Sequence, residues 1–413
     1  MKPKSTRRAT FPRIVTTMLV ASALSATAAH AATFQYRHPV VGLVAGTTAQ
    51  AQQVVTEILV ALTGGPALPA GEVNLPYNYD LKQLLSVSGD PAYNSSNVSW
   101  ELASGGLPAG LSLGSDGVIS GTPTTKNVAG SSFQVKAAYK TKTGQQAYTI
   151  VVNGAVLHVT RISAGSNHTC AVTTSGGAKC WGSNNYGQLG NNSSTNSSVP
   201  VNVVGLTSGV ASLTGGNSHT CAVTTSGGAK CWGRDNYGQL GNGITYTQYS
   251  SPVDVVGLTS GVMSITGGLS HTCAVTTSGG AKCWGYNGEG ALGNNSAVHS
   301  NVPVDVYGLT SGVVSLQAGD ATYGATCAVT TAGGAKCWGY NSSGQLGNNS
   351  YTNSSVPVDV VGLTSGVASL TVGGAHACAV TTSGGAKCWG ANGYGQFGNN
   401  STTNSRVPVD VLP

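Results

Sequence analysis

The sequence predicts an all-β fold in which a small β-sandwich precedes an array of five repeats. The composition is the first reason: the 413 residues include 60 Gly and only 8% charged residues, against about 7% Gly and 25% charged residues in ordinary domains. Five near-identical units of about 50 residues each are the second reason. The third is that ten cysteines form five equally spaced pairs. A coiled coil or long helix is excluded, because it would need many Glu, Lys, Leu and Ala.

Residues 1–31 have the pattern of a secretory signal peptide. They contain five basic residues and no acidic one, an apolar run from Ile14 to Leu24, and small residues that end in Ala29-His30-Ala31. We expect cleavage after Ala31. A membrane anchor is the alternative, but the run is shorter than the about 20 residues that a span needs. We therefore expect an exported protein, in the periplasm, at the cell surface or outside the cell.

Residues 32–64 and 65–153 are two further segments. The first is expected to be a lead-in with little structure of its own, apart from a short strand near 34–36 and a helix-like stretch at 49–62. The second is expected to fold as a small β-sandwich, because it contains short runs of β-branched and aromatic residues between turn signals. Its strands are expected at residues 77–81, 98–102, 133–137 and 148–152.

Two phrases in this segment, GLPAGLSL at 106–113 and GVISGTP at 117–123, resemble the bacterial immunoglobulin-like (dystroglycan/cadherin-like) domain. The resemblance implies an immunoglobulin-like domain over residues 65–153. Some relatives bind calcium, but Asp90 and Asp116 are isolated and lack the clustered carboxylates that this cation prefers. We therefore expect no cofactor here.

Each cysteine pair in the repeats brackets a hairpin signal. In the first unit, a turn at 175–177 would place Cys170 opposite Cys180 on two antiparallel strands. Opposite residues have Cα atoms about 4.5–5.5 Å apart, which suits a disulfide. Zinc sites are the alternative, but no C-x-x-C motif occurs. We predict the disulfides Cys170–Cys180, Cys221–Cys231, Cys273–Cys283, Cys327–Cys337 and Cys378–Cys388.

Each unit contains signals for four short strands. It holds an alternating apolar strand, the cysteine hairpin, a Trp-Gly pair, a Gly-rich loop and a Val-Pro-Val strand. This is typical of a propeller blade, which cannot bury its own faces and stacks on its neighbours. One large aromatic residue per unit is expected between the stacked sheets. These residues are Trp181, Trp232, Trp284, Trp338 and Trp389.

Three motifs, HTCAV at 168–172, WGSN at 181–184 and GQLG at 187–190, resemble the regulator of chromosome condensation repeats, which form β-propellers. They recur over residues 156–413, with GALG at 290–293 and GQFG at 395–398 as departures. Propellers of this family typically have more blades than the five units found here. The sequence does not decide between a closed ring, an open arc and an assembly completed by another chain. An arc would allow self-association.

Four histidines, His168, His219, His271 and His376, each lie two residues before a hairpin cysteine. In a closed ring they would surround the axis, where imidazoles could hold a metal. The resemblance favours a structural role instead, and Ala325 occupies this position in the fourth unit. We therefore expect no metal.

Two units differ from the others in loop length, and such loops commonly carry a binding surface. The second unit has an extra residue near Tyr246 and Tyr249, and the fourth has extra residues around Asp320 and Tyr323. Tyrosines in polar loops suit protein recognition. These four residues are the candidate binding residues, and neutral drift of the loops is the alternative.

The sequence favours binding over catalysis. It contains no nucleophile elbow, phosphate loop or metalloprotease helix, so we expect no enzyme. Beyond residue 31 there are 14 basic and 13 acidic residues, a net charge of +1 without the basic clusters that nucleic acid needs. We expect an exported protein that binds a protein or glycan through a propeller face, without stable membrane insertion. Because secreted members of the family inhibit β-lactamases, an inhibitor of an exported enzyme is the alternative, and a hydrolase is less favoured.

Overall fold

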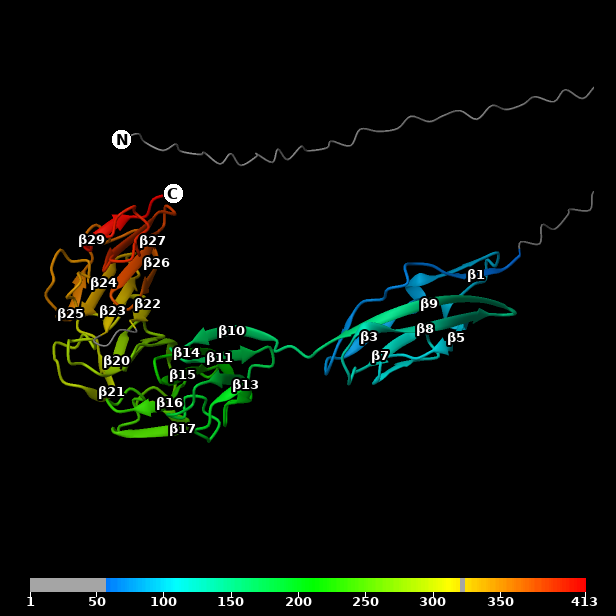
Figure 1. The fold of residues 1–413 in the computed structure, drawn as a ribbon, viewed down its shortest axis with the longest axis horizontal. Coiled ribbons are helices and arrows are strands. Elements are labelled where there is room, and N and C mark those ends of the chain that lie inside the picture. Colours follow the sequence, from blue (N-terminus) through cyan, green and yellow to red (C-terminus); the bar gives the residue numbers. More distant parts are fainter. Residues whose placement is uncertain (1–56, 320–323) are drawn as a thin grey trace, which may run out of the picture.

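The computed structural model describes residues 57–319 and 324–413 (Figure 1). The described part is a small β-sandwich followed by five four-stranded sheets, which confirms the predicted fold class. The predicted signal peptide and most of the predicted lead-in lie outside the described residues. Across the described ranges, no helix is long and apolar enough to cross a membrane.

The sandwich is built from strands β1 to β9. Its sheets have the orders β2-β9-β8-β5, β3-β7-β6 and β1-β4, and the four strands expected from the sequence correspond to β3, β5, β8 and β9. The strands are β1 (Leu59–Leu62), β2 (Gly71–Glu72), β3 (Tyr77–Asp80), β4 (Leu85–Ser88), β5 (Ser99–Gly105), β6 (Leu111–Leu113), β7 (Val118–Gly121), β8 (Asn127–Tyr139) and β9 (Lys142–Asn153). Two short 3-10 helices cover Leu81–Leu84 and Ser95–Asn97.

Strand β1 corrects the predicted start of the sandwich. Residues 59–62 were expected to end a helix-like stretch in the lead-in, but they pair with β4 and bury Val60 and Leu62 in the sandwich core. A short apolar run fits a buried strand as well as a helix. Here the alternation of buried and exposed side chains decides for the strand, so the sandwich begins at Leu59 and not at residue 65.

The two carboxylates considered for calcium make contacts within the sandwich. Asp90 pairs with Lys140 and accepts a hydrogen bond from the Tyr139 hydroxyl at 2.9 Å. The Lys140 ammonium is the main cause that lowers the pKa of Asp90 to about 2. Asp116 accepts the backbone N–H of Val118 at 3.2 Å. The first carboxylate thus holds an ion pair and the second shapes a turn.

Each repeat folds as one antiparallel sheet whose four strands pair in sequence order. Successive first strands contact one another, so they line the inner side of the array. The first two sheets comprise β10 (Val159–Ala164), β11 (His168–Thr173), β12 (Ala178–Gly182) and β13 (Ser197–Asn202), then β14 (Val210–Gly215), β15 (His219–Thr224), β16 (Ala229–Asp235) and β17 (Thr247–Asp254). The third comprises β18 (Val262–Gly267), β19 (His271–Thr276), β20 (Ala281–Gly285) and β21 (Ser300–Asp305). The last two comprise β22 (Val313–Ala318), β23 (Ala325–Thr330), β24 (Ala335–Gly339) and β25 (Ser354–Asp359), then β26 (Val367–Val372), β27 (His376–Thr381), β28 (Ala386–Gly390) and β29 (Ser405–Asp410).

The five sheets form an open arc (Figure 1). Each sheet packs against the next, and no strand pairing joins the first sheet to the last within the described residues. The apolar clusters lie between consecutive sheets: Cys221 and Val223 of the second repeat, for example, pack with Ala274 and Trp284 of the third. Of the arrangements left open by the sequence, the structure therefore shows the arc.

All five predicted disulfides form between the second and third strands of their repeats. Cys170 lies directly opposite Cys180, and the other pairs have the same register. The Cα atoms of each pair are 4.0–4.1 Å apart. Each disulfide therefore closes one hairpin inside one repeat and leaves the packing between repeats to other contacts.

Candidate functional site

The longest loop of each repeat joins its third strand to its fourth. Because the strands alternate in direction, these five loops emerge at the same edge of their sheets. We call this edge the long-loop edge. It consists of residues 183–196, 234–246, 286–299, 340–353 and 391–404, and the first two residues of the second range still belong to β16.

A buried asparagine organises four of these loops. In the first repeat, the Asn184 side-chain amide donates hydrogen bonds to Asn191 Oδ1 at 3.1 Å and to the carbonyl oxygens of Ser193 and Thr195 at 2.9 and 3.0 Å. Its own Oδ1 accepts the backbone N–H of Leu189 at 2.8 Å. One side chain therefore replaces the backbone pairing that a tight loop lacks. The same bonds recur around Asn287, Asn341 and Asn392.

The second repeat has Asp235 at this position. Its side chain is fully buried, and its Oδ1 accepts the backbone N–H of Leu240 at 3.0 Å. Its Oδ2 has no hydrogen-bond partner among the described residues. Burial raises the pKa of Asp235 to about 7. An ionised carboxylate cannot donate the bonds that asparagine makes, and this loop takes another path: β16 and β17 pair as far as Asp235 and Thr247, and the Tyr246 N–H donates to the Asp235 carbonyl at 2.9 Å.

The four candidate binding residues from the sequence have different outcomes. Tyr246 lies at the tip of its loop, 83% exposed and with a φ of 62°. Tyr249 belongs to β17 and packs, half-buried, against the core between the second and third repeats. Asp320 and Tyr323 lie outside the described residues. Of the four, the structure thus presents Tyr246 to solvent.

Arginine–tyrosine pairs link neighbouring repeats within or directly next to the long-loop edge. The Arg234 guanidinium of the second repeat lies 5.0 Å from the ring centre of Tyr186 in the first. Arg406 of the fifth repeat lies 5.6 Å from the ring centre of Tyr351 in the fourth. A cation over an aromatic face is attracted by the ring quadrupole. Each pair therefore holds a tyrosine ring in place at a junction between repeats.

A three-ring cluster lies at the junction of the second and third repeats. Tyr237 packs edge-on against Tyr286 and His299, with ring centres 5.1 and 5.2 Å apart, and Tyr286 lies 4.8 Å from His299. His299 Nδ1 accepts the backbone N–H of Asn287 at 2.9 Å, so the neutral ring carries its proton on Nε2. The cluster therefore combines aromatic faces with a fixed imidazole donor.

Several of the exposed large side chains of this edge are tyrosines. Tyr394 is 96% exposed, and Tyr351 and Tyr186 are also exposed. The sequence analysis singled out Tyr246 but none of these three tyrosines, although a tyrosine precedes the Gly-Gln pair in three repeats. We call the following set the tyrosine row: Tyr186, Tyr237, Tyr246, Tyr286, Tyr351 and Tyr394.

The buried histidines join one repeat to the next. The Nε2 atoms of His168, His219 and His271 lie 2.8, 3.0 and 2.9 Å from the hydroxyl of a threonine in the following repeat. Because the Thr220 hydroxyl donates its only hydrogen to the Gln188 carbonyl, it must accept from His168. Burial lowers the pKa values of these histidines to about 4, 3 and 4 in the same order. Within the described residues, no three His, Cys, Asp or Glu side chains lie together as a metal site would require.

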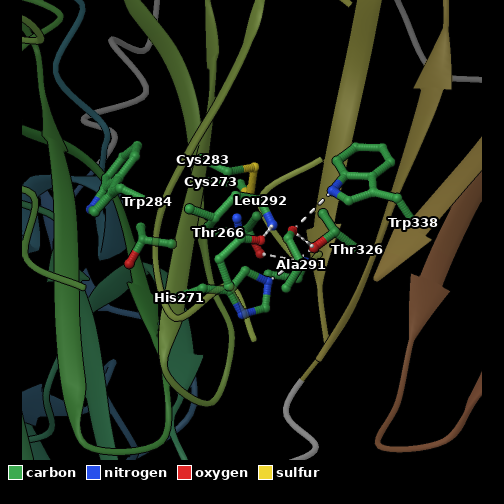
Figure 2. Close-up of a disulfide and its surroundings, with 12 residues drawn as sticks. Thr266, His271, Cys273, Cys283, Trp284, Ala291, Leu292, Thr326 and Trp338 are labelled. Atoms are coloured by element: carbon green, nitrogen blue, oxygen red, sulfur yellow. Dashed lines mark hydrogen bonds between the residues drawn. A yellow bond between two sulfur atoms is a disulfide. The ribbon is translucent and has the colours of Figure 1, made fainter. Parts of the chain in front are cut away.

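Figure 2 shows one of these contacts in full. The carbonyl oxygen of Ala291 in the third repeat accepts two hydrogen bonds from the fourth, from Trp338 Nε1 at 2.9 Å and Thr326 Oγ1 at 3.0 Å. His271 Nε2 in turn donates to Thr326. We call this arrangement of histidine, threonine, tryptophan and carbonyl the joint. It also connects the first repeat to the second and the second to the third.

Comparison with known families agrees with the two parts of the fold. The regulator of chromosome condensation (RCC1) repeat is matched in two versions, at residues 159–188, 210–239, 263–291 and 367–396, and at residues 176–223, 227–275 and 337–380. The family described as "Putative Ig domain" matches residues 59–153.

Individual relatives match the repeat array. Human E3 ubiquitin-protein ligase HERC2 is 32% identical over 255 residues, which are 60% of this chain and 5% of that protein. The ultraviolet-B receptor UVR8 of Arabidopsis thaliana is 29% identical over 258 residues, 61% of this chain and 58% of that protein. The chain thus spans under two thirds of these relatives.

Two solved structures share the fold of the array. Human WBSCR16 aligns with a TM-score of 0.55 at 21% identity, over 76% of this chain and 83% of that one. The structure of Kap60 bound to yeast RCC1 (Prp20) aligns with a TM-score of 0.53 at 19% identity, over 62% and 61% of the two chains. The chain therefore carries RCC1 repeats in a propeller-like arc, preceded by an immunoglobulin-like domain at residues 59–153.

Proposed function

We propose that the chain is an exported, non-enzymatic binding protein that uses the tyrosine row to bind a protein partner. The exposure of Tyr246 and Tyr394 at the long-loop edge is the observation that carries the proposal. Tyrosine offers a large contact area and a hydroxyl at a low entropic cost. The arginine–tyrosine pairs lower that cost further, because they order part of the surface before a partner arrives.

The chemistry of the edge supports binding more than catalysis. Its arginines face tyrosine rings, its imidazole His299 is fixed by a backbone N–H, and its buried Asp235 is closed off from solvent. Among these groups, all within the described residues, no two are therefore arranged to transfer a proton to a bound substrate. A protein that shares the fold of the array, yeast RCC1, also binds another protein, as in its structure with Kap60.

Export is supported by two features. Ten cysteines are all paired in the repeats, and such disulfides persist in oxidising compartments outside the cytoplasm. The N-terminal 31 residues have the composition of a signal peptide. Processing after Ala31 would leave residues 32–413 as the exported form.

The test is capture of partners from the native extracellular mixture by immobilised residues 32–413. The variant Tyr246→Asn with Tyr394→Asn is expected to lose at least about tenfold in affinity for the captured protein, because it removes two exposed anchors. Asparagine suits the positive φ at position 246. Tyr307→Asn is the matched control, since Tyr307 is 62% exposed but lies in the connection between the third and fourth repeats, outside the long-loop edge.

Equal capture by the double variant and the wild-type chain would contradict the proposal. Retention of a polysaccharide in place of a protein would also contradict it, because the partner would then belong to another class of molecule.

A further inference from the structure

We propose that the two ends of the arc bind each other, so that the last repeat of one copy packs against the first repeat of a second copy. The proposal concerns the end faces of the array and is independent of the tyrosine row. It rests on the observation that these faces are the separated halves of a contact that recurs between repeats inside the chain.

The last repeat leaves an apolar face uncovered. Val380 in β27 is 43% exposed, whereas the equivalent valines of the other four repeats are at most 4% exposed. Ala386 in β28 is exposed, whereas its four equivalents are buried. A hollow of about 130 Å³ lies on this face, lined by Cys378, Val380 and Ala386 among others. In the earlier repeats, the next sheet covers these positions.

The first repeat leaves the opposite face uncovered. Ile162 in β10 is 65% exposed, whereas the equivalent Leu316 and Leu370 are buried. Val159 is exposed, and its equivalents in the other four repeats are buried. Trp181 is half-buried, whereas the other four repeat tryptophans are fully buried. These residues are the counterparts of those that dock onto the preceding sheet elsewhere in the chain.

The hydrogen-bonding groups of the two faces also match. Four tryptophans donate to a carbonyl of the preceding repeat, at 2.9–3.0 Å. Trp181 has no preceding repeat, and its indole N–H has no partner among the described residues. At the other end, the carbonyl of Gln396 and the ring of His376 occupy the acceptor and donor positions of the joint, and within the described residues no repeat packs against them.

A second copy fits because the repeats are so alike. The run HTCAVTTSGGAKCWG is identical at 168–182, 219–233 and 271–285, so the second and third strands of the first repeat are the same as those with which the second and third repeats dock. The last repeat presents His376, Cys378, Val380 and Ala386, which match His168, Cys170, Val172 and Ala178 of the first. The last face of one copy and the first face of another therefore reproduce an internal contact.

Such a contact is heterologous, because it joins two different faces. Each added copy leaves one first face and one last face free, so assembly continues as a chain of copies unless the geometry closes a ring. The expected behaviour is a mass that increases with concentration and does not stop at a dimer.

The test is sedimentation velocity of residues 32–413 over a wide range of concentration. Val380→Asp blocks the last face and Ile162→Asp blocks the first, and both side chains are exposed, so the fold should tolerate either change. Each variant alone is expected to stay monomeric. A mixture of the two is expected to form a one-to-one dimer and nothing larger, because one free face of each kind remains.

Val256→Asp is the matched control, since Val256 is 49% exposed in the connection between the second and third repeats and away from both ends. It should assemble like the wild-type chain. A wild-type chain that stays monomeric at all concentrations would overturn the proposal. So would assembly of either blocked variant alone, which would indicate contact between like faces, or a mixture that stays monomeric.

Discussion

Replacement of Asp235 by asparagine is expected to stabilise the repeat array, and more strongly at higher pH. The wild-type side chain is fully buried with one oxygen unpartnered. Four sister repeats have asparagine at this position, where its amide donates to the loop. The variant removes a buried charge and introduces the side chain that the other four repeats have at this position.

The magnitude follows from the pKa of Asp235, which burial raises from 3.8 to about 7. Between these two values the folded state binds more protons than the unfolded state, so the wild-type chain loses stability as the pH rises. A shift of about three units corresponds to about 4 kcal/mol, at 1.36 kcal/mol per unit. The advantage of Asp235→Asn should therefore grow from about 1 kcal/mol near pH 4.5 to about 4 kcal/mol near pH 8.

Urea unfolding at these two pH values, followed by tryptophan fluorescence, would measure the difference. Five of the six tryptophans lie in the repeats, so the signal reports on the array. Contributions from the buried histidines cancel between variant and wild type. The reverse change, Asn287→Asp, is the matched control and should impose a cost with the same pH dependence.

An advantage of the same size at both pH values would refute this reasoning, because it would show that Asp235 does not change its ionisation on folding. A control variant whose stability does not depend on pH would refute the wider claim that the asparagine position excludes a charge.

Three further predictions concern the joints, the disulfides and the histidines. Trp232→Phe should lower the free energy of unfolding by about 1–3 kcal/mol, because it leaves a buried carbonyl without its indole donor. Trp181→Phe should lower it by under about 0.5 kcal/mol. Urea unfolding measures both changes. Replacement of both Cys221 and Cys231 by alanine should lower the free energy of unfolding by on the order of 2–3 kcal/mol. Calorimetry with and without reductant checks that the difference between this variant and the wild-type chain disappears on reduction. Burial lowers the pKa of His219 to about 3, whereas the unfolded group titrates near 6.5. The folded state therefore needs a neutral His219, and the free energy of unfolding should fall as the pH drops below 6.5, by about 3 kcal/mol at pH 4. His219→Gln should make the acid unfolding profile flatter, and an unchanged profile would count against the assignment.

The local features of the repeats could be predicted from the sequence. Cys170 and Cys180 lie ten positions apart around a turn signal, and this spacing alone places them opposite each other. The burial of Trp284 also followed, since a propeller-like stack needs a large side chain between its sheets. Both features depend on contacts within one repeat or on the repetition itself.

The long-loop edge could be predicted only in part, because its side-chain contacts join different repeats. Tyr237 meets Tyr286, which is 49 positions later, and no periodic pattern marks that pair. Tyr249 was expected in a loop, but β17 begins at Thr247, so Tyr249 lies in this strand and its ring packs against the core. The number of units likewise did not decide between a ring and an arc, because closure depends on the angle at each junction.

The junction between the fourth and fifth repeats lacks most of the joint. Ala325 stands where the other repeats have histidine and Ala377 stands where they have threonine, so only the bond from Trp389 to the Gln345 carbonyl, at 2.9 Å, is left. When tension is applied along the chain, the array should therefore part first at this junction. The fifth repeat would separate as a unit with its disulfide intact, and the four repeats before it would keep their joints.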